Sequence, residues 1–599
     1  MRKIWLLIVF LMISISTVAK PSIGLVGDED FVIAEWFANA NVPYLSLSLS
    51  DLETSILEKL DLIIINSAPQ FTKEQLSDLK RYLRTGGKVC VLAGVLANDL
   101  LDGKLIDGSI AFTLGITALT QLDNAYLVLD ETTINLPTAY SLTPRRGTEL
   151  GYYTTGDIGA LITNNSLLLG IPSLSEELLG SNALCNFFLS SIKSFLLDES
   201  LLDTAKNRLD PQKLSGADLE MYKKANELQK KLKTMSLSEA FDAFDQSLKL
   251  YTDSYLKTLP SRTIETRAVW YRPPTNKFSI LEDLDTMQKL GINLIFVETW
   301  WEGGLLYPNG PVSQRPEFLG WDPLACIITE AHKRDIEVHA WLEVFFSGYK
   351  KPGEILTKHP DWAAVGLDGN IPVKAEDDKY FIDPAHKEAR AFILGMFVEM
   401  VKEYELDGLH LDYIRYPLGA PIPYGFSLNT QELFQKTTGL EFPWSPSHPN
   451  WAAFNRFKEE QVTSFVAELR EVVLRVRPLE ISAAVFPGND ALVNKNQNWS
   501  DWIQNNYLDF ICLMLYSRNT TTVEYWLQES INQIDNKIPY YPALAAISIP
   551  EGELLLEQTL LIQKYYLPGV AFFAWNHFND ELIKYLETGP FREKAKRKQ

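Results

Sequence analysis

The sequence predicts an α/β protein whose second half is a (β/α)8 barrel, also called a TIM barrel. The chain has 599 residues, too many for one compact core, so at least two domains are expected. Its composition, with 46% hydrophobic and 22% charged residues, is typical of globular proteins. This excludes a disordered, fibrous or multi-spanning membrane protein. Between about residue 263 and residue 589, eight apolar strand-like runs alternate with helical patterns.

The eight runs justify the barrel one by one, because each is short, apolar and followed by a helix-like segment. They span residues 266–273, 292–301, 336–346, 408–417, 480–489, 508–519, 538–547 and 569–578. An open, doubly wound sheet is the structural alternative, but such a sheet seldom alternates eight times in succession. The barrel is therefore the expected fold of residues 262–590, followed by a basic tail at 591–599.

The first part of the chain shows a different α/β pattern. Strands are expected at 22–27, 60–66 and 88–94, with helices at 28–41 and 72–84. The strand–helix–strand order predicts a parallel sheet in residues 20–198. This region resembles flavodoxin-like and class I glutamine-amidotransferase-like folds. It lacks the nucleophilic Cys that those amidotransferases carry after a strand, so a scaffold or wall-binding role is expected. Residues 199–261 are predicted to be a helical connector between the two domains.

Residues 1–19 have the pattern of a signal peptide. Arg2 and Lys3 precede an apolar run at 4–15, and small residues follow at 16–19. The run is shorter than the ~20 residues that span a bilayer. We therefore expect an exported protein, extracellular, periplasmic or on the cell surface, with no membrane insertion after signal cleavage.

Charge, cysteine and histidine usage exclude several classes of function. The formal net charge of −20 argues against nucleic acid as a partner, because a phosphate backbone attracts Lys and Arg. The four cysteines, at positions 90, 185, 326 and 512, form neither a disulfide framework nor a paired metal spacing. The seven histidines are scattered singly, and the first barrel strand lacks a His-x-His pair, which disfavours a metal-dependent amidohydrolase. No metal and no cofactor are expected, and the oligomeric state is left open.

Side-chain alternation along two strands predicts a pair of acids in one cavity. If Leu409 and Leu411 face the helices, His410 and Asp412 face the barrel mouth. If the apolar residues 338, 340 and 342 face outward, His339, Trp341 and Glu343 face inward. A third acid, Glu298, ends the second strand.

Paired carboxylates among aromatic rings are the groups that hydrolysis of a glycosidic bond requires. One acid protonates the leaving oxygen, while the other carboxylate attacks the anomeric carbon or activates water. The candidate catalytic residues are Asp412, Glu298 and Glu343. The candidate substrate-binding residues share positions near the carboxyl ends of the strands, where TIM barrels build their sites. They are His339, Trp341, Trp300, Trp301, His410, Arg415, Tyr416, Tyr516, Trp575 and Asn576.

Several motifs in one order resemble a known family. DGLHLDYIRYP at 407–417, FVETWWEGGLLYP at 296–308, the segment 320–341, HPDW at 359–362 and FIDPAHKEAR at 381–390 are similar to the glycosyl-hydrolase-like family 10 barrel proteins. The resemblance implies a TIM barrel that acts on glycosidic bonds, with some relatives acting on peptidoglycan stripped of its peptides. It also implies that the Asp of the fourth strand, Asp412, is a catalytic carboxylate. The resemblance slightly favours Glu298 over Glu343 as its partner, whereas strand geometry favours Glu343.

Together these observations predict an exported glycoside hydrolase that cleaves a polysaccharide, possibly peptidoglycan glycan strands, by a two-carboxylate mechanism. The alternative is a non-catalytic carbohydrate-binding barrel, which would keep the aromatic residues and tolerate loss of the acids. Sugar, linkage, stereochemistry and endo or exo action are left open.

Overall fold

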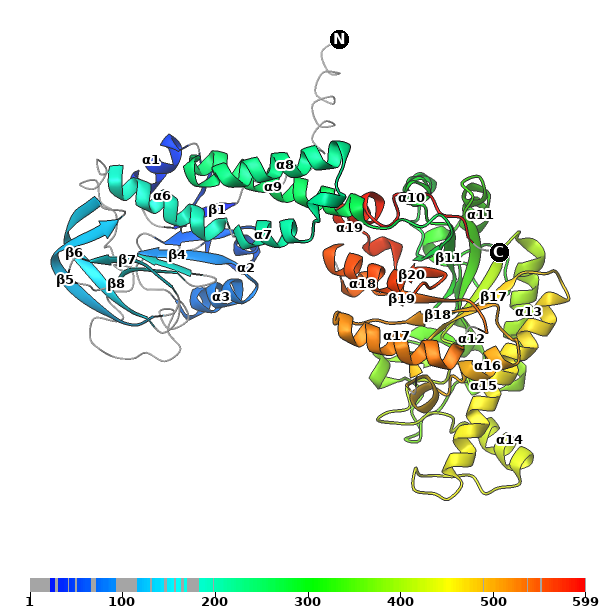
Figure 1. Ribbon diagram of the computed structural model, residues 1–599. Coiled ribbons are helices and arrows are strands. Elements are labelled where there is room, and N and C mark those ends of the chain that lie inside the picture. Colours follow the sequence, from blue (N-terminus) through cyan, green and yellow to red (C-terminus); the bar gives the residue numbers. More distant parts are fainter. Residues whose placement is uncertain are drawn as a thin grey trace, which may run out of the picture. The chain divides into compact units, whose positions relative to one another are not determined.

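The computed structural model divides the chain into two compact units, Met1–Thr258 and Leu259–Gln599 (Figure 1). It describes residues 22–26, 31–40, 42–48, 51–65, 72–92, 116–129, 132–144, 148–153, 155, 158–162, 166–169, 182–197, 199–488, 490–535, 537–549 and 552–597. The predicted signal peptide at 1–19 lies outside these residues. Within the described part of the chain, no helix has both the length and the apolar character needed to cross a bilayer.

The first unit is built on a nine-stranded sheet in the order β2-β1-β3-β4-β9-β8-β7-β5-β6. Its parallel half consists of β1 (Ile23–Val26), β2 (Leu45–Leu47), β3 (Leu62–Ile65), β4 (Lys88–Leu92) and β9 (Ser166–Leu169). This half has the 2-1-3-4-5 order of flavodoxin-like sheets, with β9 as the fifth strand. An antiparallel extension adds β5 (Ile116–Leu129), β6 (Thr132–Pro144), β7 (Thr148–Tyr153) and β8 (Ile158–Ile162).

Local sequence signals account for the helices of the parallel half. The unit contains α1 (Phe31–Asn39), α2 (Thr54–Leu57) and α3 (Lys73–Arg84). Helix α3 begins at a capping box, in which Thr72 accepts from the backbone of Gln75 and Gln75 accepts from the backbone of Thr72. The predicted α/β sheet of the first region is confirmed, and β2 is a parallel strand that the sequence pattern did not indicate.

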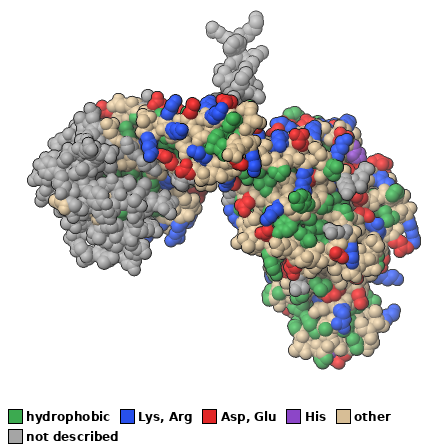
Figure 2. Space-filling model, in the orientation of Figure 1, with side chains coloured by type: hydrophobic (Ala, Val, Ile, Leu, Met, Phe, Trp, Pro, Cys, Tyr) green, Lys and Arg blue, Asp and Glu red, His purple; other side chains and the backbone are tan. Residues whose placement is uncertain are grey.

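Among the described residues, four further helices belong to the first unit and share its core. They are α6 (Asn182–Leu196), α7 (Glu199–Asn207), α8 (Gly216–Lys231) and α9 (Leu237–Thr258). Ala225, Phe241 and Tyr251 are buried in one apolar cluster with Ile33 and Leu62 of the α/β sheet layer. The segment predicted as a connector therefore packs as part of the first unit. Figure 2 shows Lys and Arg interspersed with Asp and Glu over α8 and α9, as expected for a solvated helix face.

The second unit is a closed barrel of eight parallel strands, which confirms the predicted fold class. The strands are β10 (Thr266–Tyr271), β11 (Leu294–Trp301), β13 (Glu337–Glu343), β16 (Gly408–Asp412), β17 (Glu480–Val485), β18 (Phe510–Met514), β19 (Tyr540–Leu544) and β20 (Gly569–Phe572). They pair in chain order, and pairing of β10 with both β11 and β20 closes the ring. Three short strands lie in the loops: β12 (Gly304–Leu305), β14 (Phe346–Tyr349) and β15 (Lys379–Phe381).

Helices follow the strands and cover the outside of the barrel (Figure 1). They are α10 (Lys277–Leu290), α11 (Pro323–His332), α12 (Glu354–Lys358), α13 (Lys387–Glu403), α14 (Leu428–Thr438), α15 (Trp451–Leu474), α16 (Trp499–Gln504), α17 (Thr520–Ile534), α18 (Gly552–Lys564) and α19 (Asp580–Thr588). Outward-facing strand residues such as Val338, Leu342 and Leu409 pack against these helices in one large apolar cluster. Inward-facing residues such as Phe296, Trp341 and Phe510 fill the barrel interior in a second cluster.

Candidate active site

A cavity of about 210 Å³ opens at the carboxyl ends of the barrel strands. Six strands or the loops directly after them contribute to it, which is where the (β/α)8 fold places active sites. The lining residues are Trp270, Arg272, Trp341, Glu343, Asp412, Tyr413, Arg415, Ala484, Phe486, Met514, Tyr516 and Phe573. Aromatic rings and four charged groups therefore surround one hollow.

Alternation along β13 and β16 brings the two predicted acids into this cavity. Leu409 and Leu411 pack in the cluster between strands and helices, so Asp412 points inward as expected. Glu343 and Asp412 are register partners on the paired strands β13 and β16. The two carboxylates therefore lie at the same height on neighbouring strands.

The two carboxylates differ in their hydrogen bonds. Asp412 Oδ1 accepts from the Tyr413 backbone N–H at 2.7 Å, and Oδ2 accepts from the Trp341 indole N–H at 3.1 Å. Glu343 is 2% exposed, and its Oε2 has no partner within the described part of the chain. Asp412 thus accepts two hydrogen bonds, while one carboxyl oxygen of Glu343 accepts none from the described residues.

The surroundings raise the pKa of both acids. For Glu343, burial raises the pKa well above its ordinary value, and the negative charges of Glu298 and Asp412 add to this, while Arg272 opposes it. For Asp412, burial also raises the pKa, while its two hydrogen bonds and the charges of Arg415 and Arg272 oppose the rise. The group most ready to hold a proton near neutral pH is therefore Glu343.

Glu298 lies beside the cavity, where two guanidinium groups bind it. Arg272 Nε donates to Glu298 Oε1 at 2.6 Å, and Arg315 donates to Oε2 at 3.0 Å. The Arg272 guanidinium in turn lies 5.1 Å from the Trp341 ring and 5.3 Å from the Phe573 ring, both of which line the cavity. Glu298 therefore fixes Arg272 in the cavity wall instead of presenting a bare carboxylate.

Arg415 lines the cavity but does not neutralise Asp412 directly. Its guanidinium binds both oxygens of Glu376, at 3.0 and 2.7 Å. The guanidinium also lies over the Tyr413 ring, with 4.9 Å to the ring centroid. Glu376, from the loop before β15, thus orients Arg415 toward the site.

Seven of the ten predicted binding residues lie outside the cavity lining, and two of them, Trp300 and Tyr416, are buried away from it. Trp300 is fully buried on the helix side, where its indole donates to Phe346 O and its ring packs against Phe397. The reason is a register shift in β11 between Glu298 and Trp300, which reverses the alternation of side chains. Tyr416 is 1% exposed, and its hydroxyl donates to Asp383.

His410 and His339 face inward as predicted, but they lie in lower layers of the barrel. The His410 ring stacks on Phe296 at 3.9 Å and contacts Ser482 Oγ at 2.9 Å, and burial lowers its pKa to about 3. Neither histidine belongs to the lining of the mouth. Each precedes the acid of its strand by two or four residues, which places it nearer the barrel floor.

The three remaining aromatic and amide candidates flank the mouth. Trp301 is partly buried, with the Arg315 guanidinium 5.0 Å from its ring. Trp575 donates from its indole to Asp283 at 2.8 Å, and Asn576 contacts the ring of His577. Of the ten predicted binding residues, the cavity lining contains Trp341, Arg415 and Tyr516.

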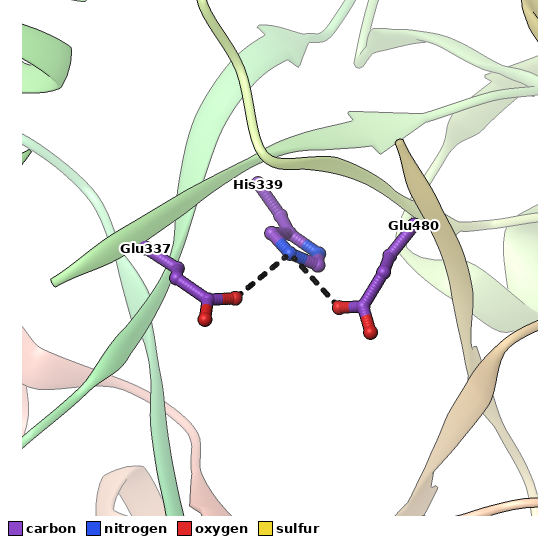
Figure 3. A group of neighbouring side chains, drawn as sticks. All are labelled: Glu337, His339 and Glu480. Atoms are coloured by element: carbon purple, nitrogen blue, oxygen red, sulfur yellow. Dashed lines mark ion pairs between the residues drawn. The ribbon is translucent and has the colours of Figure 1, made fainter. Parts of the chain in front are cut away.

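His339 lies with Glu337 and Glu480 at the amino ends of β13 and β17, away from the mouth (Figure 3). Its Nε2 is 4.0 Å from Glu337 Oε2 and 3.6 Å from Glu480 Oε2. In the described part of the chain this is the one group of three or more possible metal-ligating residues with ligand atoms within 4.8 Å. The Arg597 guanidinium forms ion pairs with both carboxylates, so a cationic side chain already balances their negative charges.

Sequence reasoning missed more than half of the cavity wall. Seven of the twelve lining residues were not among the candidates: Trp270, Arg272, Tyr413, Ala484, Phe486, Met514 and Phe573. Arg272 directly follows β10, so the rule that selected other strand-end residues could have found it. Its ion pair with Glu298 joins residues 26 positions apart, so no local sequence pattern indicates that the two side chains meet.

The closed barrel with two acids at its mouth defines a TIM-barrel protein with a candidate active site. Residues 263–553 match the family model described as glycosyl hydrolase-like 10, which confirms the resemblance predicted from the motifs. A curated relative, glycosyl hydrolase DigH of Escherichia coli O6:H1 (strain CFT073), is 25% identical over 301 residues, covering 45% of this chain and 64% of the relative. Glycosyl hydrolase YngK of Bacillus subtilis (strain 168) is 26% identical over 302 residues, covering 42% of this chain and 54% of the relative. The match thus spans between about half and two thirds of these relatives' length.

Solved structures with a similar arrangement include two glycosidases. An α-L-fucosidase isoenzyme 2 from Paenibacillus thiaminolyticus gives a TM-score of 0.42 at 13% identity, covering 54% of this chain and 48% of that chain. A β-galactosidase from the psychrophilic Marinomonas ef1 also gives 0.42 at 13% identity, covering 54% and 58%. The barrel itself is established by the strand pairing described above.

Proposed function

We propose that the barrel hydrolyses glycosidic bonds of a polysaccharide, with Asp412 and Glu343 as the catalytic carboxylates. The observation that carries this proposal is their placement at register-paired positions of β13 and β16 in one aromatic-lined cavity. Glycoside hydrolysis usually requires two carboxyl groups beside the bound sugar, and this cavity provides two. The sequence left Glu298 and Glu343 open as the partner of Asp412, and the ion pairs of Glu298 favour Glu343.

The proposed roles follow from the different surroundings of the two acids. A general acid must hold a proton at the working pH, and the raised pKa of Glu343 supports that role. The second group must be ionised and correctly oriented, and the two hydrogen bonds to Asp412 favour its carboxylate form. Glu343 thus donates the proton to the leaving oxygen, while Asp412 attacks the anomeric carbon or activates water.

We also propose retention of the anomeric configuration. Paired positions on neighbouring strands lie roughly 4.8 Å apart. This is the spacing of the backbones, and two side chains that point into the barrel from it favour the ~5–5.5 Å carboxyl separation of retaining glycosidases over the ~6.5–9.5 Å of inverting ones. Asp412 is then the nucleophile, and an NMR measurement of the anomer first released tests the assignment.

The substrate that we propose is a cell-wall glycan, and peptidoglycan strands without peptides are the first candidate. The resemblance to family 10 proteins supports this choice, and the signal-like residues 1–19 support an exported enzyme. The decisive experiment is digestion of a glycan panel that includes peptide-free peptidoglycan, with products identified by mass spectrometry. Binding of a glycan without cleavage by the wild-type protein would instead favour the non-catalytic carbohydrate-binding alternative.

A further inference from the structure

A second cavity of about 480 Å³ adjoins the candidate active site. The two cavities share Phe486, Met514 and Tyr516 in their linings. The remaining wall comes from the segment after β17 and from the middle of α17, and consists of Pro487, Asp490, Tyr525, Trp526 and Glu529. Both cavities therefore lie at the same end of the barrel, with Tyr516 between them.

The sizes of the cavities indicate how much ligand each can hold. Cavities that bury a drug-sized ligand usually measure ~300–1,000 Å³. The catalytic cavity, at about 210 Å³, falls below this range, whereas the second cavity, at about 480 Å³, lies within it. A chain of several sugars that reacts at Asp412 must extend beyond the first cavity, and the second is the adjoining hollow.

The wall of the second cavity has the chemistry of a sugar-binding surface. Phe486 and Trp526 are partly buried and Tyr525 is 63% exposed, so ring surface in this cavity is accessible to a ligand. Flat aromatic faces can pack against the C–H faces of sugar rings, which removes apolar surface from water.

The two carboxylates of the cavity differ in whether they already accept hydrogen bonds from other side chains of the protein. Asp490 accepts from Lys495 Nζ at 2.6 Å and from Asn494 Nδ2 at 2.7 Å. The Glu529 carboxylate has no hydrogen-bond partner among the residues that the structure describes, and it lies near the left-handed Gly488. Glu529 can therefore accept hydrogen bonds from sugar hydroxyls, and its negative charge disfavours an acidic sugar.

We propose that this second cavity is a subsite that binds an uncharged sugar unit adjacent to the one held at Asp412. The inference rests on the proposed function and adds to it a preference for oligosaccharides over the shortest cleavable substrate. The sugar unit packs on Tyr525 and Trp526, and its hydroxyl groups donate to Glu529. The subsite contributes to binding of the polymer and does not touch the bond that breaks.

Tyr525→Ala tests the subsite through its dependence on substrate length. The probes are peptide-free peptidoglycan oligosaccharides of two, four and six sugars. The variant is expected to lower kcat/KM by about 3- to 10-fold for the oligosaccharides that reach the second cavity, which corresponds to the loss of one aromatic contact. The shortest cleaved oligosaccharide should be processed as by the wild type. An equal loss at all lengths, or no loss at any length, overturns the proposal.

Two further variants separate the subsite from effects on the fold. Tyr566→Ala removes another exposed tyrosine, 90% exposed, which lies just before β20 at the opposite end of the barrel, and it should leave all rates unchanged. Glu529→Gln keeps the size of the side chain, and it should weaken the same long oligosaccharides that Tyr525→Ala weakens. If it alters the shortest substrate instead, the subsite assignment is wrong.

Binding measurements distinguish failure of the subsite from failure of the proposed function. Calorimetric titration of the six-sugar probe into the wild type and into Tyr525→Ala requires no turnover. If the wild type cleaves no probe but binds the six-sugar probe about 3- to 10-fold more tightly than the variant does, the subsite stands and the hydrolase proposal fails. If the wild type cleaves the probes and Tyr525→Ala matches it in binding and in rate at every length, the hydrolase proposal stands and the subsite fails. If the wild type does not bind the six-sugar probe, the subsite is overturned.

Discussion

Glu343 and Asp412 occupy register-paired positions on the neighbouring strands β13 and β16, and both line the cavity at the barrel mouth. Their negative charges repel each other, and burial penalises both ionised forms. Asp412 has two hydrogen-bond donors, whereas Glu343 Oε2 has no partner among the described residues. A single proton shared by this pair therefore belongs on Glu343, which is the arrangement that the proposed proton donor and nucleophile require.

Asp412→Asn is expected to lower turnover by about 10²–10⁴-fold or more, because the amide cannot attack the sugar. The variant keeps the shape of the side chain, so its melting temperature should stay close to that of the wild type. Steady-state assays on the glycan identified by the panel, together with thermal denaturation, check both expectations.

Asp535→Asn is a matched control for this substitution. Asp535 ends α17 in a left-handed conformation with φ 49°, which Asn also adopts readily. It lies outside the cavity lining, so the control should retain full activity. Near-normal turnover by Asp412→Asn would contradict the proposed mechanism.

Glu343 should control the alkaline side of the pH–rate profile. The proposed acid works only when protonated, so kcat/KM falls as the pH rises through the raised pKa of Glu343. Asp412 works only when ionised, so the rate also falls as the pH drops through its own pKa. In Glu343→Gln, residual activity on an aryl glycoside with a good leaving group should lose the alkaline limb and keep the acid limb. An unchanged alkaline limb would assign the proton donor to another group.

The same substitution should make the protein more stable at neutral pH. Because the pKa of Glu343 is higher in the folded state, the folded protein binds this proton more tightly than the unfolded chain. Wild-type stability is then lost as the pH rises from about 4.5 through the folded pKa. Glu343→Gln removes that loss and should gain about 1–3 kcal/mol in free energy of unfolding near neutral pH, with little gain at about pH 4. Urea denaturation at both pH values measures the difference, and a larger gain at the lower pH would refute it.

The fold was predictable because periodicity is local, and the site was predictable only where that periodicity holds. Asp412, Glu343 and Trp341 reach the cavity because β13 and β16 alternate regularly. Trp300 was predicted to bind substrate, but one register shift in β11 turns it toward the helices and away from the cavity lining.

The local sequence pattern does not show how deep in the barrel a strand residue lies, nor which residues distant in sequence form contacts. His339 and Glu343 share one face of β13, yet the histidine lies near the barrel floor and the acid at the mouth. Arg272 and Glu298 meet only because β10 and β11 are neighbours in the folded barrel. In the first unit, β5 to β8 extend the sheet antiparallel, which the strand–helix pattern did not indicate.

Glu298→Gln should lower both stability and the proposed activity by releasing Arg272 and Arg315 from their shared carboxylate. Removal of one partner from a buried ion pair costs about 3–5 kcal/mol of stability. Azide should not restore turnover, because Glu298 acts by positioning Arg272. Azide should restore turnover of Glu343→Gln on an aryl glycoside. This anion is a nucleophile that needs no general base, so it attacks the anomeric carbon of the glycosyl-enzyme in place of water, releasing the Asp412 carboxylate and a glycosyl azide.

Glu317→Gln is the matched control, since Glu317 also binds Arg315, at 3.0 Å, but is 39% exposed at its side chain. It should change activity and stability little. Rescue of Glu298→Gln by azide would show that Glu298 is itself the catalytic partner of Asp412.

Arg597→Ala should destabilise the barrel without affecting catalysis. The Arg597 side chain is 8% exposed and binds both Glu337 and Glu480, so its removal leaves two carboxylates without their cation. The expected cost is about 3–5 kcal/mol in free energy of unfolding. Burial already raises the pKa of Glu480 and Arg597 opposes this, so the loss of stability should grow as the pH rises above about 5. Lys594→Ala, an exposed residue of the same tail, is the control and should be neutral.

Zinc should restore part of the stability that Arg597→Ala loses. Without the guanidinium, the His339 ring and the carboxylates of Glu337 and Glu480 offer three ligand atoms within 4.8 Å. Neither nitrogen of His339 has a hydrogen-bond partner among the described residues. Nitrogen and carboxylate oxygen are ligands that Zn²⁺ accepts. Thermal denaturation with Zn²⁺ or EDTA should therefore separate the variant from the wild type, whose melting temperature stays constant because Arg597 occupies the position of the cation. Equal stabilisation of both proteins by zinc would show that the ion binds elsewhere.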